Sequence, residues 1–163
     1  MMMAYFLTCN RCKETTKAWE IVDLITEHTH DDGMLKCTKC DGEAHVYQVS
    51  QTQDGGKWER YIRAVIAFKT QFGDAYVPYV FLLSYTPNGK LQDVHFNYYK
   101  DLRASGGRLK HGHGPGGAPV FGKGGILRLL EHLAEHGILS PSELTALAGK
   151  VERKTRKPRR TGD

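Results

Sequence analysis

The four cysteines of this chain form two identically spaced pairs, Cys9 with Cys12 and Cys37 with Cys40, and 24 residues separate the pairs. In a C-x2-C pair two sulfur atoms can approach one ion while backbone N–H groups support the thiolate charge. Four thiolates in a tetrahedron are a preferred shell for Zn²⁺. An Asp-Gly dipeptide follows the second pair and suits the tight turn that such a knuckle needs. The spacing therefore predicts one structural zinc ion held by all four cysteines.

Disulfides, unliganded thiols and redox chemistry are the competing uses of these cysteines. The N-terminal segment lacks the basic residues of a signal peptide, and no apolar stretch reaches the length of a membrane span. We therefore expect a cytoplasmic or nucleoid-associated protein that does not bind membranes, in a compartment that keeps thiols reduced. The duplicated pair, with no thioredoxin-like βαβ pattern after it, disfavours a redox site. Because four cysteines fill a zinc shell, we interpret His28 and His30 as surface histidines.

The cysteine arrangement resembles the zinc-ribbon superfamily, in particular the ribbons of transcription elongation factors and small RNA polymerase subunits. The resemblance covers only the N-terminal quarter, residues 1–49. It implies a hairpin stapled by zinc that binds nucleic acid or protein. In the elongation-factor ribbon an Asp-Glu pair at a hairpin tip assists cleavage by the polymerase. Here Asp31 and Asp32 lie closer to the second knuckle and no Glu accompanies them, so that activity is not implied.

The basic charge of the chain is confined to its C-terminal end. Residues 150–163 carry seven basic and two acidic side chains, whereas residues 1–149 carry 16 of each and are formally neutral. A basic cluster without an apolar face favours nucleic acid, DNA or RNA, over a membrane as its partner, because it neutralises phosphates without reading sequence. The candidate phosphate-binding residues are Lys150, Arg153, Lys154, Arg156, Lys157, Arg159 and Arg160 in this segment, with Arg63 and Lys110 elsewhere.

An antiparallel sheet is expected over residues 58–100. A polar segment at 50–56 ends in two glycines and predicts a boundary between a ribbon module at 1–49 and a domain at 57–149. Beyond the boundary, apolar residues alternate from Trp58 to Phe68, residues 76–85 are apolar on both faces, and Thr86–Lys90 predicts a hairpin turn before a returning strand. One sheet face, which either stacks bases or packs under helices, would present Tyr61, Arg63, Lys69, His95, Asn97 and Tyr99.

Two helices are expected near the C-terminus, at 124–136 and 141–151. The first ends at His136-Gly137, and the second begins with a capping box from Ser140 to Glu143. The buried stripe of the second is expected from Leu144, Leu147, Ala148 and Val151. Residues 152–163 are expected to form a disordered basic tail. The predicted fold class is therefore α+β: a zinc ribbon, an antiparallel sheet and two C-terminal helices.

A glycine-rich loop at 104–125 is the second unusual feature. It contains His111 and His113, which with His95 could carry protons or bind a metal, and it leads into a helix whose N–H groups could attract phosphate. Its G-x-G-x-x-G match does not follow a parallel strand, so we reject a dinucleotide site. A flexible connector that happens to be rich in histidine accounts for the same residues equally well.

Three functions follow from these features. The sequence favours a non-enzymatic, nucleic-acid-associated adaptor that binds the phosphate backbone through its basic tail. The second is an enzyme acting on phosphodiesters or nucleotides with His95, His111 and His113. The third is a protein-interaction subunit of a larger assembly, which only the ribbon supports. No nuclease-like carboxylate pair beside a lysine and no Ser-His or Cys-His signature is present, so enzymatic activity stays open but disfavoured.

Overall fold

The protein is described from a computed structural model that covers residues 4–51, 55–68, 76–111 and 123–155. These residues form three α-helices, one short 3₁₀ helix and seven strands, and every strand pairs antiparallel with its neighbours. The α+β prediction is confirmed. The elements are β1 (Tyr5–Cys9), β2 (Thr15–Ala18), α1 (Ile21–His28), β3 (Ala44–Gln51), β4 (Lys57–Ala67), β5 (Tyr76–Ser84), β6 (Asp93–Asp101), η1 (Arg103–Ser105), β7 (Leu109–His111), α2 (Lys123–Glu135) and α3 (Pro141–Thr155).

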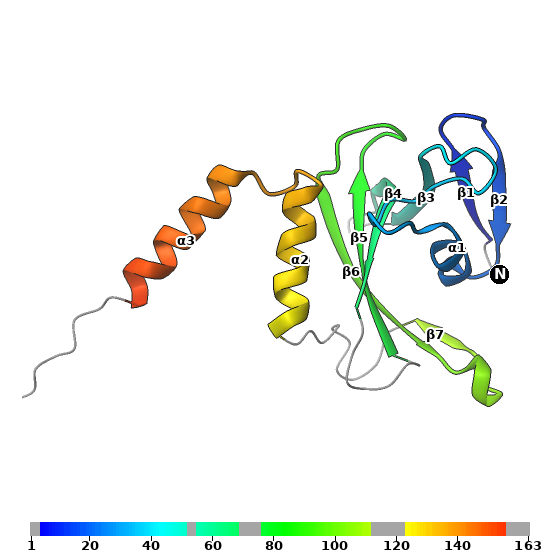
Figure 1. Cartoon of the computed structure of the whole chain (residues 1–163). Helices are drawn as coiled ribbons and strands as arrows, with labels where there is room; N and C mark the ends of the chain where they lie inside the picture. The colour runs from blue at the N-terminus through cyan, green and yellow to red at the C-terminus, as the bar shows by residue number, and fades with distance from the viewer. Residues whose placement is uncertain (1–3, 52–54, 69–75, 112–122, 156–163) are drawn as a thin grey trace, which may run out of the picture.

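A single sheet runs through both the cysteine segment and the middle of the chain. Its strand order is β2-β1-β3-β4-β5-β6-β7 (Figure 1). The β3–β4 pairing, from Val46 opposite Ile62 to Gln51 opposite Lys57, joins the strands of the cysteine segment to the rest. The boundary expected at 50–56 therefore spans the last two residues of β3 and the connection from β3 to its pairing partner β4.

Helices cover the two faces of the sheet, and Figure 1 shows α1 and α2 on opposite sides of it. On one face, α1 packs its apolar side into a core built by the inward residues of the strands. On the other face, Leu129 and Leu133 of α2 pack against Ala64, Ile66 and Leu82. Residues alternate between the faces of a strand, so the apolar run in β5 supplies both cores. This explains why β5 is buried along most of its length.

A bulge in β4 changes which residues face which core. Ile62 pairs with Leu83 but Ala64 pairs with Leu82, so Arg63 is the extra residue. As a result Ile62 belongs to the α1 core and Ala64 to the α2 core. The prediction of one uninterrupted apolar face along β4 is wrong for this reason.

The expected polar face does not exist as one surface. Arg63, Asn97 and Tyr99 are buried, and Tyr99 lies in the α1 core. Tyr61 points to the opposite face, because it pairs with Ser84, whereas Tyr99 pairs with Val77. Lys69 lies outside the described residues. The helix α1, rather than a C-terminal helix, covers the His95 side of the sheet.

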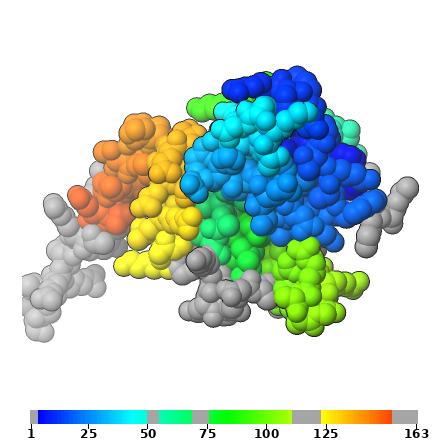
Figure 2. Space-filling model, turned by 45° about the vertical axis from the view of Figure 1, so that its right-hand side comes forward, coloured from blue at the N-terminus to red at the C-terminus, as the bar shows by residue number. Residues whose placement is uncertain are grey.

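The two C-terminal helices are confirmed, but α3 packs differently from the prediction. Gly137, with φ 67°, ends α2 as expected, and the Ser140–Glu143 capping box begins α3. The expected buried stripe of α3 is wrong: Leu147 and Val151 are 49% and 53% exposed, since α3 extends away from the sheet (Figure 1). Helix α3 continues to Thr155, and residues 156–163 lie outside the described part. Figure 2 shows α2 and α3, yellow to orange, beside the body of the sheet.

No helix within the described residues combines the length and the apolar character needed to cross a membrane.

Candidate metal centre

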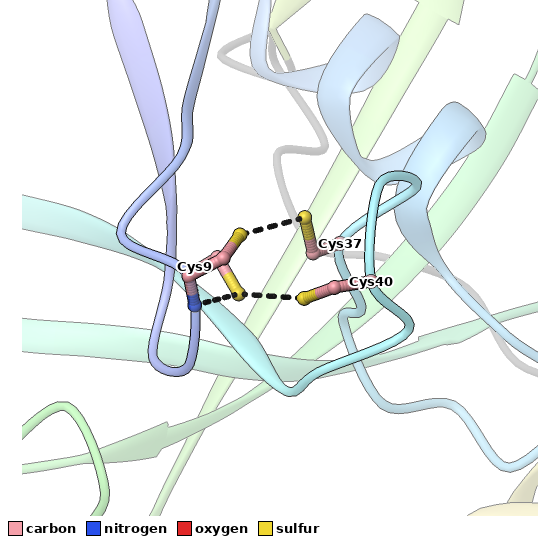
Figure 3. Close-up of side chains that lie close together, drawn as sticks. Cys9, Cys37 and Cys40 are labelled. Atoms are coloured by element: carbon pink, nitrogen blue, oxygen red, sulfur yellow. Dashed lines mark hydrogen bonds between the residues drawn. The ribbon is translucent and has the colours of Figure 1, made fainter.

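The four cysteines come from two segments that the sheet brings together. Cys9 ends β1 and Cys12 lies in the turn to β2, while Cys37 and Cys40 lie in the loop before β3. All four sulfur atoms lie within 4.8 Å of one another. Figure 3 shows the sulfur of Cys9 facing that of Cys40, with Cys37 beside them. Among the described residues, this is the single group of metal-ligand type.

The sulfur positions match the shell of a tetrahedral metal ion. Four sulfurs placed about 2.3 Å from one zinc ion are about 3.8 Å from each other. The Sγ atoms of Cys9 and Cys40 are 3.6 Å apart, and those of Cys12 and Cys37 are 3.8 Å apart. Disulfide sulfurs are about 2.05 Å apart, and all four cysteines are free. The geometry fits one metal ion and excludes disulfides within this arrangement.

The two knuckles share one backbone feature. The residue after the second cysteine of each pair is left-handed, with φ 63° at Lys13 and 55° at Asp41. In the first knuckle the N–H groups of Arg11 and Cys12 donate to Cys9 Sγ at 3.3 and 3.4 Å. These hydrogen bonds stabilise a thiolate, which is the form that binds a metal.

The electrostatics of the cluster favour a bound cation. Burial opposes ionisation of Cys9, but the N–H groups of Cys12 and Arg11 lower the pKa of its thiol to about 6. For Cys12 a backbone hydrogen bond from Glu14 favours the thiolate, yet burial and the three neighbouring sulfurs raise its pKa to about 11. A thiolate at Cys9 therefore hinders ionisation of the next sulfur. A divalent ion between the sulfurs removes that repulsion.

Gly42 supports the cluster by its lack of a side chain. A Cβ atom at this position would lie 2.9 Å from Arg11 Cβ, 3.2 Å from Cys40 Sγ and 3.4 Å from Cys9 Sγ. A side chain at this position would therefore push the two knuckles apart. The Asp-Gly dipeptide was recognised in the sequence as a turn, but its role in knuckle packing depends on the fold.

We expect Gly42→Ala to destabilise the protein by about 1–3 kcal/mol, as overpacking does in other tightly packed sites. It should also weaken metal retention against a chelator, because the added methyl group pushes on two ligands. Thermal denaturation and chelator competition measure the two effects. Gly124→Ala is the matched control, since a Cβ there meets nothing within 4 Å. Equal melting temperatures for the two variants would contradict this role.

Hydrogen bonds tie the first knuckle to distant parts of the sheet. The side-chain amide of Asn10 donates to the carbonyl oxygen of Pro87 at 3.1 Å, in the β5–β6 loop. His45 Nδ1 donates to the side-chain oxygen of Asn10 at 2.7 Å. Burial, with help from the nearby Arg63 and Lys13 charges, lowers the pKa of His45. The knuckle is therefore anchored to β3 and to the β5–β6 loop by polar contacts.

Arg63 provides a second anchor and is not a surface cation. Its side chain is 7% exposed, and its guanidinium donates to a Glu43 carboxylate oxygen and to the carbonyl oxygen of Gly89. Glu43 lies between the second knuckle and β3, whereas Gly89 lies in the β5–β6 loop. Arg63, which the sequence predicts to bind phosphate, thus connects the segment that carries the cysteines to the sheet.

The two histidines between the cysteine pairs have different environments. His28 is 1% exposed, and its Nδ1 donates to the carbonyl oxygen of Lys36 at 2.8 Å. The expectation that it lies on the surface is therefore wrong, because it ends α1 with its ring in the core. His30 is exposed, as expected, and its ring lies 3.7 Å from the Asp41 carboxylate. Neither histidine belongs to the cysteine cluster.

The remaining candidate residues are not assembled into one site. His95 is half-buried between Trp58 and Phe81, and burial lowers its pKa. His111 pairs with Tyr99 of β6. Tyr99 lies four residues from His95 on the same strand, so His95 and the partner of His111 are separated by about 13 Å along β6. His113 lies outside the described residues. Lys110 is exposed on β7, and Lys150 is exposed near the end of α3.

Comparisons with protein-family models, curated proteins and solved structures found no significant match for this chain.

Proposed function

We propose that this chain is a nucleic-acid-associated adaptor whose fold depends on one structural Zn²⁺ bound by Cys9, Cys12, Cys37 and Cys40. The observation that supports the metal part of the proposal is the close cluster of four sulfur atoms, whose segment side chains tie to the sheet and to the β5–β6 loop. Four protein ligands leave no open position on a tetrahedral ion, so the metal has a structural role rather than a catalytic one.

Zinc is favoured over other metals by the ligands. Tetrahedral sulfur shells suit zinc and iron, whereas octahedral oxygen shells suit magnesium or calcium. Zinc binds such shells without redox change, which fits a site that connects β1 and β3 and serves as a structural clamp. An iron-loaded cluster would be coloured, and the purified protein with zinc is expected to be colourless.

The basic C-terminal segment supplies the nucleic-acid part of the proposal. The first 149 residues are formally neutral, so long-range attraction to phosphates comes from residues 150–163. Residues 150–155 of this segment belong to helix α3, which extends away from the sheet (Figure 1). Phosphate contacts from such a segment give affinity without sequence preference.

A C-terminal segment with three fewer positive charges tests this part directly. We expect the triple variant Lys157→Gln, Arg159→Gln and Arg160→Gln to bind DNA and RNA at least about tenfold more weakly at low salt. The slope of log affinity against log salt should fall by about 2–3, since each lost phosphate contact removes 0.7–0.9 of slope. Fluorescence anisotropy over a salt series measures both quantities.

The matched control removes three exposed lysines from the body: Lys90→Gln, Lys100→Gln and Lys123→Gln. This control should leave the affinity and the salt slope close to those of the unaltered chain. Equal loss in the two triple variants would show that overall charge, and not the tail, governs binding. Absence of binding by the unaltered chain would overturn the nucleic-acid part of the proposal.

A further inference from the structure

A row of exposed aromatic rings crosses three neighbouring strands on the sheet face opposite α1. Leu7 and Val46 pair with each other and face the α1 core, so the adjacent residues Phe6 and Tyr47 point to the opposite face. Tyr61 is the pairing partner of Tyr47, and their ring centroids are 5.3 Å apart. The row Phe6–Tyr47–Tyr61 therefore runs across β1, β3 and β4.

The rings of this aromatic row are accessible. Phe6 is 48% exposed and Tyr47 is 43% exposed, while Tyr61 is half-buried. Val49, 37% exposed, continues the same face of β3. Exposed aromatic residues that are contiguous in this way mark binding surfaces more often than isolated ones do. Helix α2 packs on the same face further along the sheet, over β4 and β5, and leaves this row uncovered.

A cation and a further ring adjoin the aromatic row. Lys17 of β2 is the pairing partner of Phe6, which places it on the same face. Its ammonium lies 4.4 Å from the centroid of the Trp19 ring, and Trp19 is 59% exposed. Within the described residues Lys17 takes part in no ion pair with a carboxylate. The edge of the row therefore combines flat aromatic surface with a positive charge that no carboxylate of the described residues pairs with.

At the other edge the charges balance each other. Lys57 and Glu59 of β4 form an ion pair, and Glu59 also accepts a hydrogen bond from Tyr47. The net charge of the row and its edges thus comes from Lys17. Flat rings with a neighbouring cation match an anionic ligand that carries aromatic groups, which is the chemistry of unpaired nucleotides.

We propose that this aromatic row is a stacking surface for the unpaired bases of single-stranded nucleic acid, with Lys17 contacting a phosphate at its edge. The inference rests on the proposed function, because the tail supplies the general attraction to phosphate. It adds the preferred substrate, since paired bases keep their faces inside the duplex and cannot stack on the rings. Every base has a π-face, so the preference is for single strands and not for a sequence.

The test compares a short fluorescent oligothymidine with a duplex of equal length, using Phe6→Ala with Tyr47→Ala in the full chain. The double variant should bind the single strand at least about tenfold more weakly and bind the duplex as before. Its salt slope should stay unchanged, because no phosphate contact is lost. Lys17→Gln should lower the single-strand slope by about 0.7. Tyr47→Phe keeps the ring and should keep the affinity.

Phe96→Ala is the matched control, since Phe96 is 46% exposed on β6, two strands from Tyr61. It should not change single-strand binding, and the melting temperature of each variant verifies that the fold is intact. Unchanged single-strand affinity in the folded double variant, with tail-dependent binding retained, overturns this inference alone. Equal losses for single strand and duplex also overturn it. No binding by the unaltered chain overturns the proposed function together with this inference.

Discussion

Replacing Cys37 by serine is expected to abolish binding of the proposed zinc ion and to cost the protein several kcal/mol of its free energy of unfolding. Apparent zinc binding to small structural sites contributes about 10–16 kcal/mol near neutral pH, which is as large as the whole stability of a typical domain. Cys37 is 5% exposed and faces Cys12, so a serine oxygen there would be a buried and poorer ligand. We expect a large fall in melting temperature or an unfolded product.

The loss should extend beyond the cysteine segment. The second knuckle leads into β3, β3 pairs with β4, and Asn10 contacts the β5–β6 loop. Chelator treatment of the unaltered chain should therefore reproduce the effect of Cys37→Ser. Thr38→Ala, between the two cysteines of the same knuckle, is the control and should melt close to the unaltered chain. A Cys37→Ser protein with an unchanged melting temperature that ignores chelator would contradict this role for the metal.

The second large effect is expected at Glu43, and it should exceed the effect at its partner Arg63. Both residues form one ion pair, but the Arg63 side chain is 7% exposed and the Glu43 side chain is 54% exposed. Glu43→Gln leaves a buried guanidinium without its counter-charge, which costs about 3 kcal/mol or more. Arg63→Met leaves a carboxylate that water can solvate, so we expect a loss of only about 1 kcal/mol.

Urea denaturation of the two single variants and of the double variant measures this asymmetry. The double variant should resemble Arg63→Met, because the buried charge is then absent in both. A larger loss for Arg63→Met than for Glu43→Gln would show that the guanidinium contributes through packing or through Gly89 rather than through the ion pair. Either result shows how much the contacts of Arg63 contribute to holding the cysteine segment against the sheet.

The four-cysteine cluster is the feature of the molecule that the sequence predicts most directly. Two C-x2-C pairs define their geometry locally, and no other cysteine competes with them. The strands at 76–84 and 93–101 and both C-terminal helices were similarly accessible, because turn residues, capping residues and apolar spacing agree there. Each of these signals depends on residues that are close together in the chain.

The features that sequence reasoning missed depend on contacts between distant residues. The β4 bulge leaves no trace in the alternation of apolar residues, so Arg63 looked exposed although it is an anchor. The resemblance to a zinc ribbon implies a hairpin over this segment and does not predict helix α1, although its apolar residues have helical spacing: Ile21, Val22, Leu24 and Ile25. His28 looked exposed because its partner, the Lys36 carbonyl, adjoins it only in the fold.

The aromatic row of Phe6, Tyr47 and Tyr61 was missed for the same reason. These residues lie in three separate segments, and only the pairing of β1, β3 and β4 places them side by side. The exposed stripe of α3 shows the opposite failure. Apolar spacing identifies the face of α3 that could pack, but it does not say whether any other part of the chain packs against that face, and Leu147 and Val151 are exposed.

The most direct measurement is the metal content of the purified protein by elemental analysis. One zinc ion per chain, lost on acidification or in Cys37→Ser, is the result that the four-sulfur geometry predicts, because protons and serine both remove thiolate ligands. A folded protein that contains no metal and whose four thiols react freely would contradict the claim that the four cysteines hold a structural metal ion.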